Sequence, residues 1–64
     1  MKYSIDEARL VIADHGFIAK VSAQGGVLVV YEGEEHLPGS WMEIGRCAIK
    51  DGKVASSSIA SVVG

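Results

Sequence analysis

The chain has 64 residues, which allows one small domain with a thin core and excludes a two-domain enzyme or a solenoid of three or more repeats. A hydrophobic content of 48% argues against intrinsic disorder, and a net charge of −2 argues against nonspecific binding to nucleic acid. No apolar run is long enough to span a bilayer. The N-terminal segment is acidic where a signal peptide would be apolar. Cys47 is the single cysteine and therefore has no partner for a disulfide within the chain. We therefore expect a single domain over residues 1–64 in the cytoplasm.

The first predicted element is a helix that starts after Ser4 and ends near His15. Ser4 and Glu7 have the spacing of a capping box, in which each side chain bonds the backbone amide of the other residue. Gly16 suits the left-handed position that follows a last helical turn. At 100° per residue, one stripe forms the core face: Ile5, Ala8, Val11, Ile12 and His15. Leu10 falls on the opposite, polar side, where it is a candidate contact for a partner.

A β-hairpin is predicted next. Residues 17–23 alternate between two faces, which are Phe17, Ala19, Val21 and Ala23 on one side and Ile18, Lys20 and Ser22 on the other. Gly25 and Gly26 supply the turn, because glycine adopts positive φ without a Cβ clash. Residues 27–31 are apolar on both faces, as is typical of an interior strand.

The chemistry changes over residues 32–40, which hold three acidic side chains, two glycines and the single proline. No strand or helix period is visible there, which predicts a loop. Residues 41–44 resume a strand-like alternation. Asp51-Gly52 then lies between two strand-like runs and predicts a second hairpin, with three facing pairs: Lys50 with Lys53, Ile49 with Val54, and Cys47 with Ser56.

The last nine residues are ambiguous. Their β-branched side chains favour a strand that continues to about Ile59 and is followed by a loose end. Alternatively, Ser57 or Ser58 caps a short terminal turn.

The order of elements predicts an α+β fold with one N-terminal helix packed on a four-stranded, mainly antiparallel sheet, α-β-β-β-β. The second face of that sheet would carry Ile18, Leu28 and Val30 with little to cover them. We therefore expect either strong curling of the sheet or association through this face.

Patterns for catalysis and for metal binding are weak. Cys47 falls in the middle of a strand, where a buried and inert thiol is the ordinary interpretation. Glu34, Glu35 and His36 are adjacent, and neighbouring side chains rarely converge on one ion. Gly25-Gly26 lacks the helix and lysine of a phosphate-binding loop. We expect no enzymatic activity, no metal and no cofactor.

Acidic side chains are concentrated early in the chain: residues 1–43 hold seven acidic and three basic side chains, whereas residues 44–64 hold one and three. No lysine or arginine lies between Glu32 and Glu43, and Trp41 and Met42 interrupt this segment. Aromatic and methionine side chains beside charge are typical of interfaces, although they also fill small cores while acidic side chains keep loops in solution. A less favoured interpretation is phosphate contact by the basic side chains of the last third, Arg46, Lys50 and Lys53.

The capped helix ending in His15-Gly16-Phe17, the short strands that follow and the mild acidity resemble the small accessory proteins of bacteriophages and prophages, among them the anti-CRISPR inhibitors of type I systems. The resemblance implies an acidic surface that blocks the nucleic-acid-binding surface of a host protein. The residues implied for this contact are Glu32, Glu34, Glu35, Glu43, Asp6, Glu7 and Asp14. Trp41, Met42 or Leu10 would supply an apolar anchor.

The leading hypothesis is therefore a phage-encoded, stoichiometric protein-binding inhibitor that acts in the bacterial cytoplasm. Its partner would be a host protein with a basic surface, such as a CRISPR effector subunit, with no direct contact to nucleic acid or membrane. The chain itself would be a monomer or a weak homodimer. The alternative is a small structural or homo-oligomerisation module that uses an exposed sheet face, in which Leu28 and Val30 matter and the acidic side chains do not.

Overall fold

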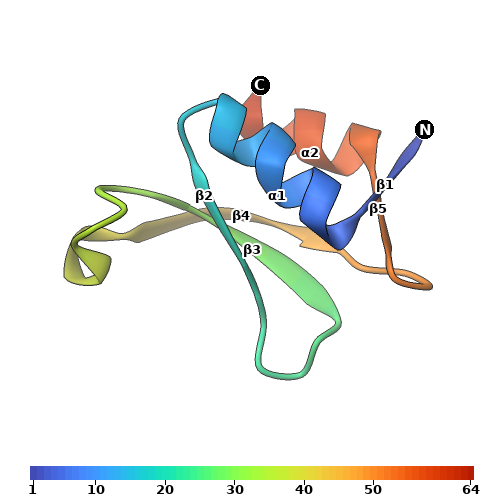
Figure 1. The fold of residues 1–64 in the computed structure, drawn as a ribbon, viewed down its shortest axis with the longest axis horizontal. Helices are drawn as coiled ribbons and strands as arrows, with labels where there is room; N and C mark the ends of the chain where they lie inside the picture. Colours follow the sequence, from blue (N-terminus) through green and yellow to red (C-terminus); the bar gives the residue numbers. More distant parts are fainter.

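The computed structural model describes all 64 residues and has α+β architecture, with two helices and two small antiparallel sheets. The elements in chain order are β1 (Lys2–Ser4), α1 (Ile5–Asp14), β2 (Ile18–Val21), β3 (Val27–Glu32), the 3-10 helix η1 (Pro38–Ser40), β4 (Met42–Ala48), β5 (Lys53–Ala55) and α2 (Ser56–Val63). The larger sheet has the order β2-β3-β4, and both helices lie on one side of it (Figure 1). Neither helix has the length and apolar character needed to cross a membrane.

Helix α1 begins and ends where its sequence predicts. The Ser4 amide donates to the Glu7 carboxylate at 2.9 Å, and the Glu7 amide donates to the Ser4 hydroxyl at 3.2 Å, which completes the capping box. Gly16 has a φ of 85°, and the Phe17 amide donates to the Ile12 carbonyl at 3.2 Å. This is the Schellman arrangement, which terminates the helix because glycine tolerates the left-handed conformation.

The first hairpin is confirmed, but the assignment of its faces was wrong for two residues. Val30 lies opposite Ala19, and Leu28 lies opposite Val21. Residues directly opposite each other share a face of the sheet, so Leu28 and Val30 point toward the helices, where both are fully buried. The sequence-based prediction placed Leu28 and Val30 with Ile18 on the uncovered face. This is an error of one residue in register, and such a shift moves every side chain of a strand to the opposite face of the sheet.

The second hairpin is confirmed only at its tip. Asp51 and Gly52 have φ values of 54° and 72°, as a two-residue type I′ turn requires, and Lys50 forms a bridge with Lys53. Beyond this point the two strands diverge, because β5 pairs with β1 instead of β4. The predicted pairs of Ile49 with Val54 and of Cys47 with Ser56 are therefore wrong. The sequence analysis did not predict strand β1, which pairs with β5 in place of β4.

The C-terminal residues form helix α2, so the favoured prediction of a strand reaching Ile59 is wrong. Ala55 is the N-cap and no side chain caps the helix, so the predicted serine cap is also absent. Packing holds the helix in place: Ile59 is 2% exposed, and Val62 lies directly over Gly45 of β4. Burial of an apolar face supplies most of the stability of a short helix. The predicted single helix on a four-stranded sheet is thus replaced by two helices on a three-stranded sheet, with β1 and β5 beside them.

The hydrophobic core lies between the helices and the larger sheet and comprises Ala8, Ile12, Ala19, Leu28, Val30, Cys47, Val54 and Ile59. No helix or strand covers the opposite side of this sheet, called here the outer face (Figure 1). Nevertheless Val29, which points to the outer face, is only 7% exposed. Its cross-strand neighbours are Lys20 and Arg46, whose long side chains cover apolar surface with their methylene groups. Val29 is thus covered by side chains of the sheet itself.

Candidate functional site

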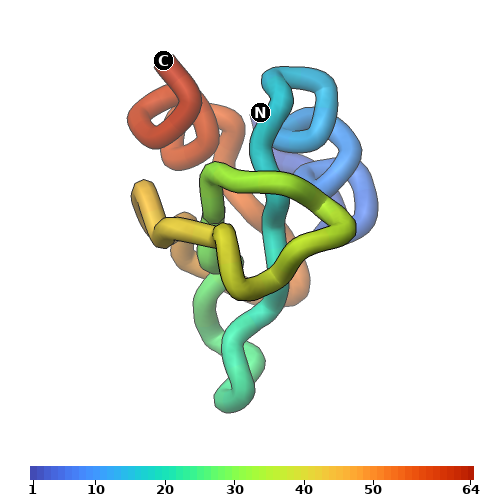
Figure 2. Tube along the Cα trace, turned by 90° about the vertical axis from the view of Figure 1, so that its left-hand side faces the viewer, coloured from blue at the N-terminus to red at the C-terminus, as the bar shows by residue number.

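The acidic loop, defined as residues 33–41, connects β3 to β4 and is held in shape by its own hydrogen bonds. The Trp41 indole Nε1 donates to the Glu34 carbonyl at 2.6 Å, and the Glu34 amide donates to the Ser40 hydroxyl at 3.1 Å. That hydroxyl donates in turn to the Leu37 carbonyl at 2.7 Å. Figure 2 shows the loop from the side on which it faces the viewer, where it curves back on itself. The backbone of a loop bonded in this way has a fixed shape.

Gly33 permits the two ends of the acidic loop to meet. Its φ of 150° is rarely adopted by residues with a side chain, and a Cβ there would lie 2.9 Å from the Ser40 carbonyl oxygen and 3.0 Å from the Trp41 Cα. Both neighbouring atoms belong to the backbone and have little freedom to move. Glycine is therefore required at this position for the loop to close.

Trp41 anchors the acidic loop to the outer face of the sheet. Its ring lies 5.5 Å from the Tyr31 ring, centroid to centroid, and the Lys20 Nζ lies 5.1 Å from its centroid, within the range of a cation–π contact. Because the indole is half-buried and its N–H points into the loop, Trp41 supports the loop more than it presents an apolar surface. The residue that the loop exposes is Leu37, which is 60% exposed. In the sequence, the feature that indicates this exposure is the position of Leu37 in a charged segment, directly before Pro38.

A groove of about 380 Å³, called here the α1 groove, lies between α1, β2 and the acidic loop. Its lining consists of Asp6, Arg9, Leu10, Ala13, Phe17, Ile18, Ala19 and Glu35. Leu10 is 69% exposed, as its position on the polar side of α1 predicted. The structure thus brings together three of the predicted site residues, Asp6, Leu10 and Glu35, although 29 positions separate Asp6 from Glu35.

Two of the predicted acidic residues, Glu7 and Glu43, already accept hydrogen bonds from groups within the fold. The Glu7 carboxylate accepts a hydrogen bond from the Ser4 amide, which lowers the pKa of Glu7. Glu43 accepts from Arg46 Nε at 2.9 Å and from Nη2 at 3.2 Å, and these bonds lower the pKa of Glu43. Residues three apart on a regular strand point to opposite faces, but the irregularity in β4 pairing opposite Val30 and Tyr31 brings Glu43 and Arg46 to the same face. Both are therefore less available to a partner.

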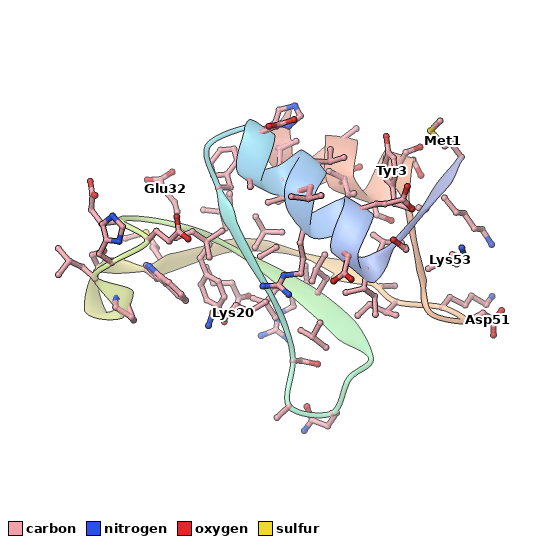
Figure 3. All side chains as sticks on the ribbon, in the orientation of Figure 1. Met1, Tyr3, Lys20, Glu32, Asp51 and Lys53 are labelled. Carbon is pink, nitrogen blue, oxygen red and sulfur yellow. The ribbon has the colours of Figure 1, made fainter.

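The other predicted acidic residues divide by position. Glu32, Glu34 and Glu35 are exposed on the acidic loop and the adjoining end of β3, and none takes part in the one ion pair of the structure. Asp14 is the last residue of α1 and lies outside the α1 groove. Glu32 and the basic hairpin tip around Lys53 lie at opposite ends of the molecule (Figure 3). Glu32 is therefore remote from Lys53, whereas Arg46, also of the basic last third, pairs with Glu43.

The side chains considered for catalysis or metal binding are dispersed. Cys47 is fully buried, and burial raises the pKa of its thiol, which disfavours the reactive thiolate. The His15 ring is bonded through Nδ1 to the Val11 carbonyl at 2.9 Å. No group of three His, Cys, Asp or Glu side chains is placed to hold a metal ion.

Comparisons with protein-family models, with curated proteins and with solved structures find no match for this chain.

Proposed function

We propose that this chain is a non-catalytic protein-binding module that docks its α1 groove and acidic loop on a cationic surface of another protein. The observation that carries the proposal is the exposed Leu10, which lies in a groove whose lining includes two carboxylates, of Asp6 and Glu35, and one guanidinium, of Arg9. An exposed apolar side chain surrounded by charge is the composition of a binding surface, in which the apolar group supplies affinity and the charges supply orientation and encounter rate.

The bonding within the acidic loop adds to this proposal. A loop that only kept the protein in solution would need no fixed shape, whereas this one is closed by Gly33 and anchored by Trp41. The backbone that carries Glu35 and Leu37 is then fixed in shape before a partner binds, so that less backbone conformational entropy is lost on binding.

Charge gives the class of partner. The carboxylates of Glu32, Glu34 and Glu35 have no ion-pair partner, so a basic surface would bind them without breaking an existing pair. In its specific form the proposal is that of a stoichiometric inhibitor: the partner's basic surface is one that binds nucleic acid, and this chain blocks it. That form follows from the resemblance to phage-encoded inhibitors. The homo-oligomerisation alternative relied on Leu28 and Val30, and both side chains are fully buried.

The test compares Glu35→Lys and Leu10→Lys with the control Asp14→Lys, which changes the net charge by two units, as Glu35→Lys does, and lies outside the groove. Each variant and the wild type is immobilised and used to capture proteins from a nuclease-treated bacterial lysate, and the bound proteins are identified by mass spectrometry. We expect a basic protein to be retained by the wild type and by Asp14→Lys, and to be lost with the other two variants. Equal retention by all four proteins, or retention by none, would contradict the proposal.

A further inference from the structure

Strand β2 is an unpaired edge of the larger sheet, because it pairs with β3 alone. The Ser22 amide donates to the Val27 carbonyl at 2.8 Å. Hydrogen-bonded and non-hydrogen-bonded pairs alternate along an antiparallel ladder. By this alternation the N–H and C=O groups of Ala19 and Val21 point away from β3, and no bond outside the ladders uses them.

This free edge coincides with the α1 groove. The groove is lined by Phe17, which precedes β2, and by Ile18 and Ala19, the first two residues of this strand. The strand then continues to Val21, which is 41% exposed. One wall of the groove is α1, and Glu35 of the acidic loop stands across from it. A backbone edge with directed donors and acceptors therefore runs beside a groove lined by five apolar side chains, two carboxylates and the guanidinium of Arg9.

We infer that the α1 groove binds an extended, basic peptide segment of a partner, which adds as a further strand to the free edge of β2. The inference rests on the proposed function and specifies the occupant of the same site. In this mode of recognition, main-chain hydrogen bonds to the sheet edge supply affinity and pockets for alternate side chains supply specificity. Residues 18–21 would pair with about four residues of the segment, or roughly 13 Å of strand.

The lining determines which side chains such a segment carries. Alternate residues of the added strand face α1, where Leu10 and Ala13 form an apolar wall. Lysine or arginine would fit beside Asp6 and Glu35, and its methylene stem would lie against the apolar lining. Arg9 is the one basic residue of the lining, so the two carboxylates leave the groove with a net negative charge.

A second copy of the chain is a poorer occupant than a basic peptide. Pairing of β2 with β2 would bring two grooves of the same sign together, on chains that each carry a net charge of −2. Like charges across an interface are unfavourable, whereas a basic segment neutralises them.

The test uses a random 12-residue peptide library displayed on phage and selected on the immobilised wild-type chain. The strongest binder is synthesised in two further forms, one N-methylated at the odd-numbered amides of its bound region and one at the even-numbered amides. N-methylation removes the N–H donor, and only alternate donors of an added strand face β2. We expect a basic peptide, at least a tenfold loss of affinity in one form and less than a twofold change in the other. Equal effects of the two forms, or no enriched peptide, would overturn the inference.

Substitutions in the protein provide the complementary test. Val21→Pro removes an outward-facing N–H at a sheet edge, where proline is tolerated, whereas Val21→Ala retains the N–H. We expect a tenfold or greater loss of peptide affinity for Val21→Pro and less than a twofold change for Val21→Ala. A thermal scan establishes whether Val21→Pro is folded, and the N-methyl series is decisive if it is not. Sedimentation velocity addresses the other occupant, since a wild-type dimer that Val21→Pro dissociates would overturn the peptide as the ligand.

The same peptide separates the two proposals. If Glu35→Lys and Leu10→Lys abolish binding while the N-methyl forms and Val21→Pro do not, the α1 groove is the binding site, but the peptide does not bind by strand addition to β2. If none of these changes affects binding, the α1 groove is not the site, and the proposed function fails with it.

Discussion

The contact between Gly45 of β4 and Val62 of α2 allows the packing of the C-terminal helix to be tested quantitatively. A Cβ at position 45 would lie 2.7 Å and 2.8 Å from the two Val62 methyl carbons, where ordinary contact begins at 3.4 Å. Gly45→Ala must therefore displace α2 or force Val62 from its rotamer, and overpacking of this kind lowers the free energy of unfolding by about 1–3 kcal/mol. For a domain of this size each 1 kcal/mol corresponds to a decrease in Tm of about 4–8 °C.

The matched partner is Val62→Ala, which removes the two methyl groups from a half-buried site and lowers the free energy of unfolding by about 1 kcal/mol. In the double variant the Cβ introduced at position 45 occupies the space that the valine methyl groups have left. We therefore expect the double variant to be no less stable than Gly45→Ala, with a coupling free energy of about 1–2 kcal/mol. Gly26→Ala is the control, because nothing lies within 4 Å of a Cβ at that position.

The measurement is urea unfolding followed by far-UV circular dichroism for the wild type, the two single variants, the double variant and the control. A coupling free energy below about 0.5 kcal/mol would mean that the two sites act independently. That result would refute the packing of α2 on β4 through Gly45.

Four further expectations concern local features. Ser4→Ala removes the acceptor at the start of α1 and should lower the free energy of unfolding by about 1 kcal/mol in urea. Folding lowers the pKa of Glu7 from 4.5, so the ionised Glu7 stabilises the folded protein at pH values above the unfolded-state pKa. This stabilisation is lost as the pH falls through the folded-state pKa. The decrease in the urea midpoint below pH 4.5 should therefore be smaller in Glu7→Gln than in the wild type. Trp41→Phe retains the ring contacts but loses the bond to the Glu34 carbonyl, so amide hydrogen exchange in the acidic loop should accelerate about tenfold. The buried Cys47 thiol should react with a disulfide reagent only at the rate of protein unfolding.

Each of these four expectations has a contradicting result. An unchanged urea midpoint for Ser4→Ala would show that the capping box contributes nothing measurable. A pH dependence identical in the wild type and Glu7→Gln would assign the acid sensitivity to other carboxylates. Unchanged exchange in Trp41→Phe would mean that the indole bond does not close the acidic loop. Reaction of Cys47 at the rate of a free thiol would show that the core opens locally without unfolding.

The features that the sequence predicted correctly are those whose partners lie within a few residues of each other. The capping box joins Ser4 to Glu7, the Schellman arrangement joins Ile12 to Phe17, and the Asp51-Gly52 turn needs only its own positive φ values. These interactions form between close neighbours in sequence, so the residue types alone specify them. The exposure of Leu10 follows equally from the period of α1.

The candidate site could be predicted only in part. The sequence indicated the acidic residues and Leu10, but it contained no signal that Glu35 lies across a groove from Asp6 or that Arg46 pairs with Glu43. The first depends on how the acidic loop is folded against α1, and the second on an irregularity in a strand where regular alternation would keep the two side chains apart.

The identity of the last element was decided by packing. Residues 56–63 combine serine with β-branched side chains, so their intrinsic preferences suit a strand or a short helix. The helix prevails because it buries Ile59 and places Val62 on Gly45, while β5 pairs with β1 at the far end of the chain. Interactions between residues close in sequence thus determined the ends of α1 and the turns. Contacts between residues distant in sequence decided which strand each strand pairs with and which carboxylates have no ion-pair partner. The physical reason is that burial and strand pairing depend on surfaces that form only when the whole chain has folded.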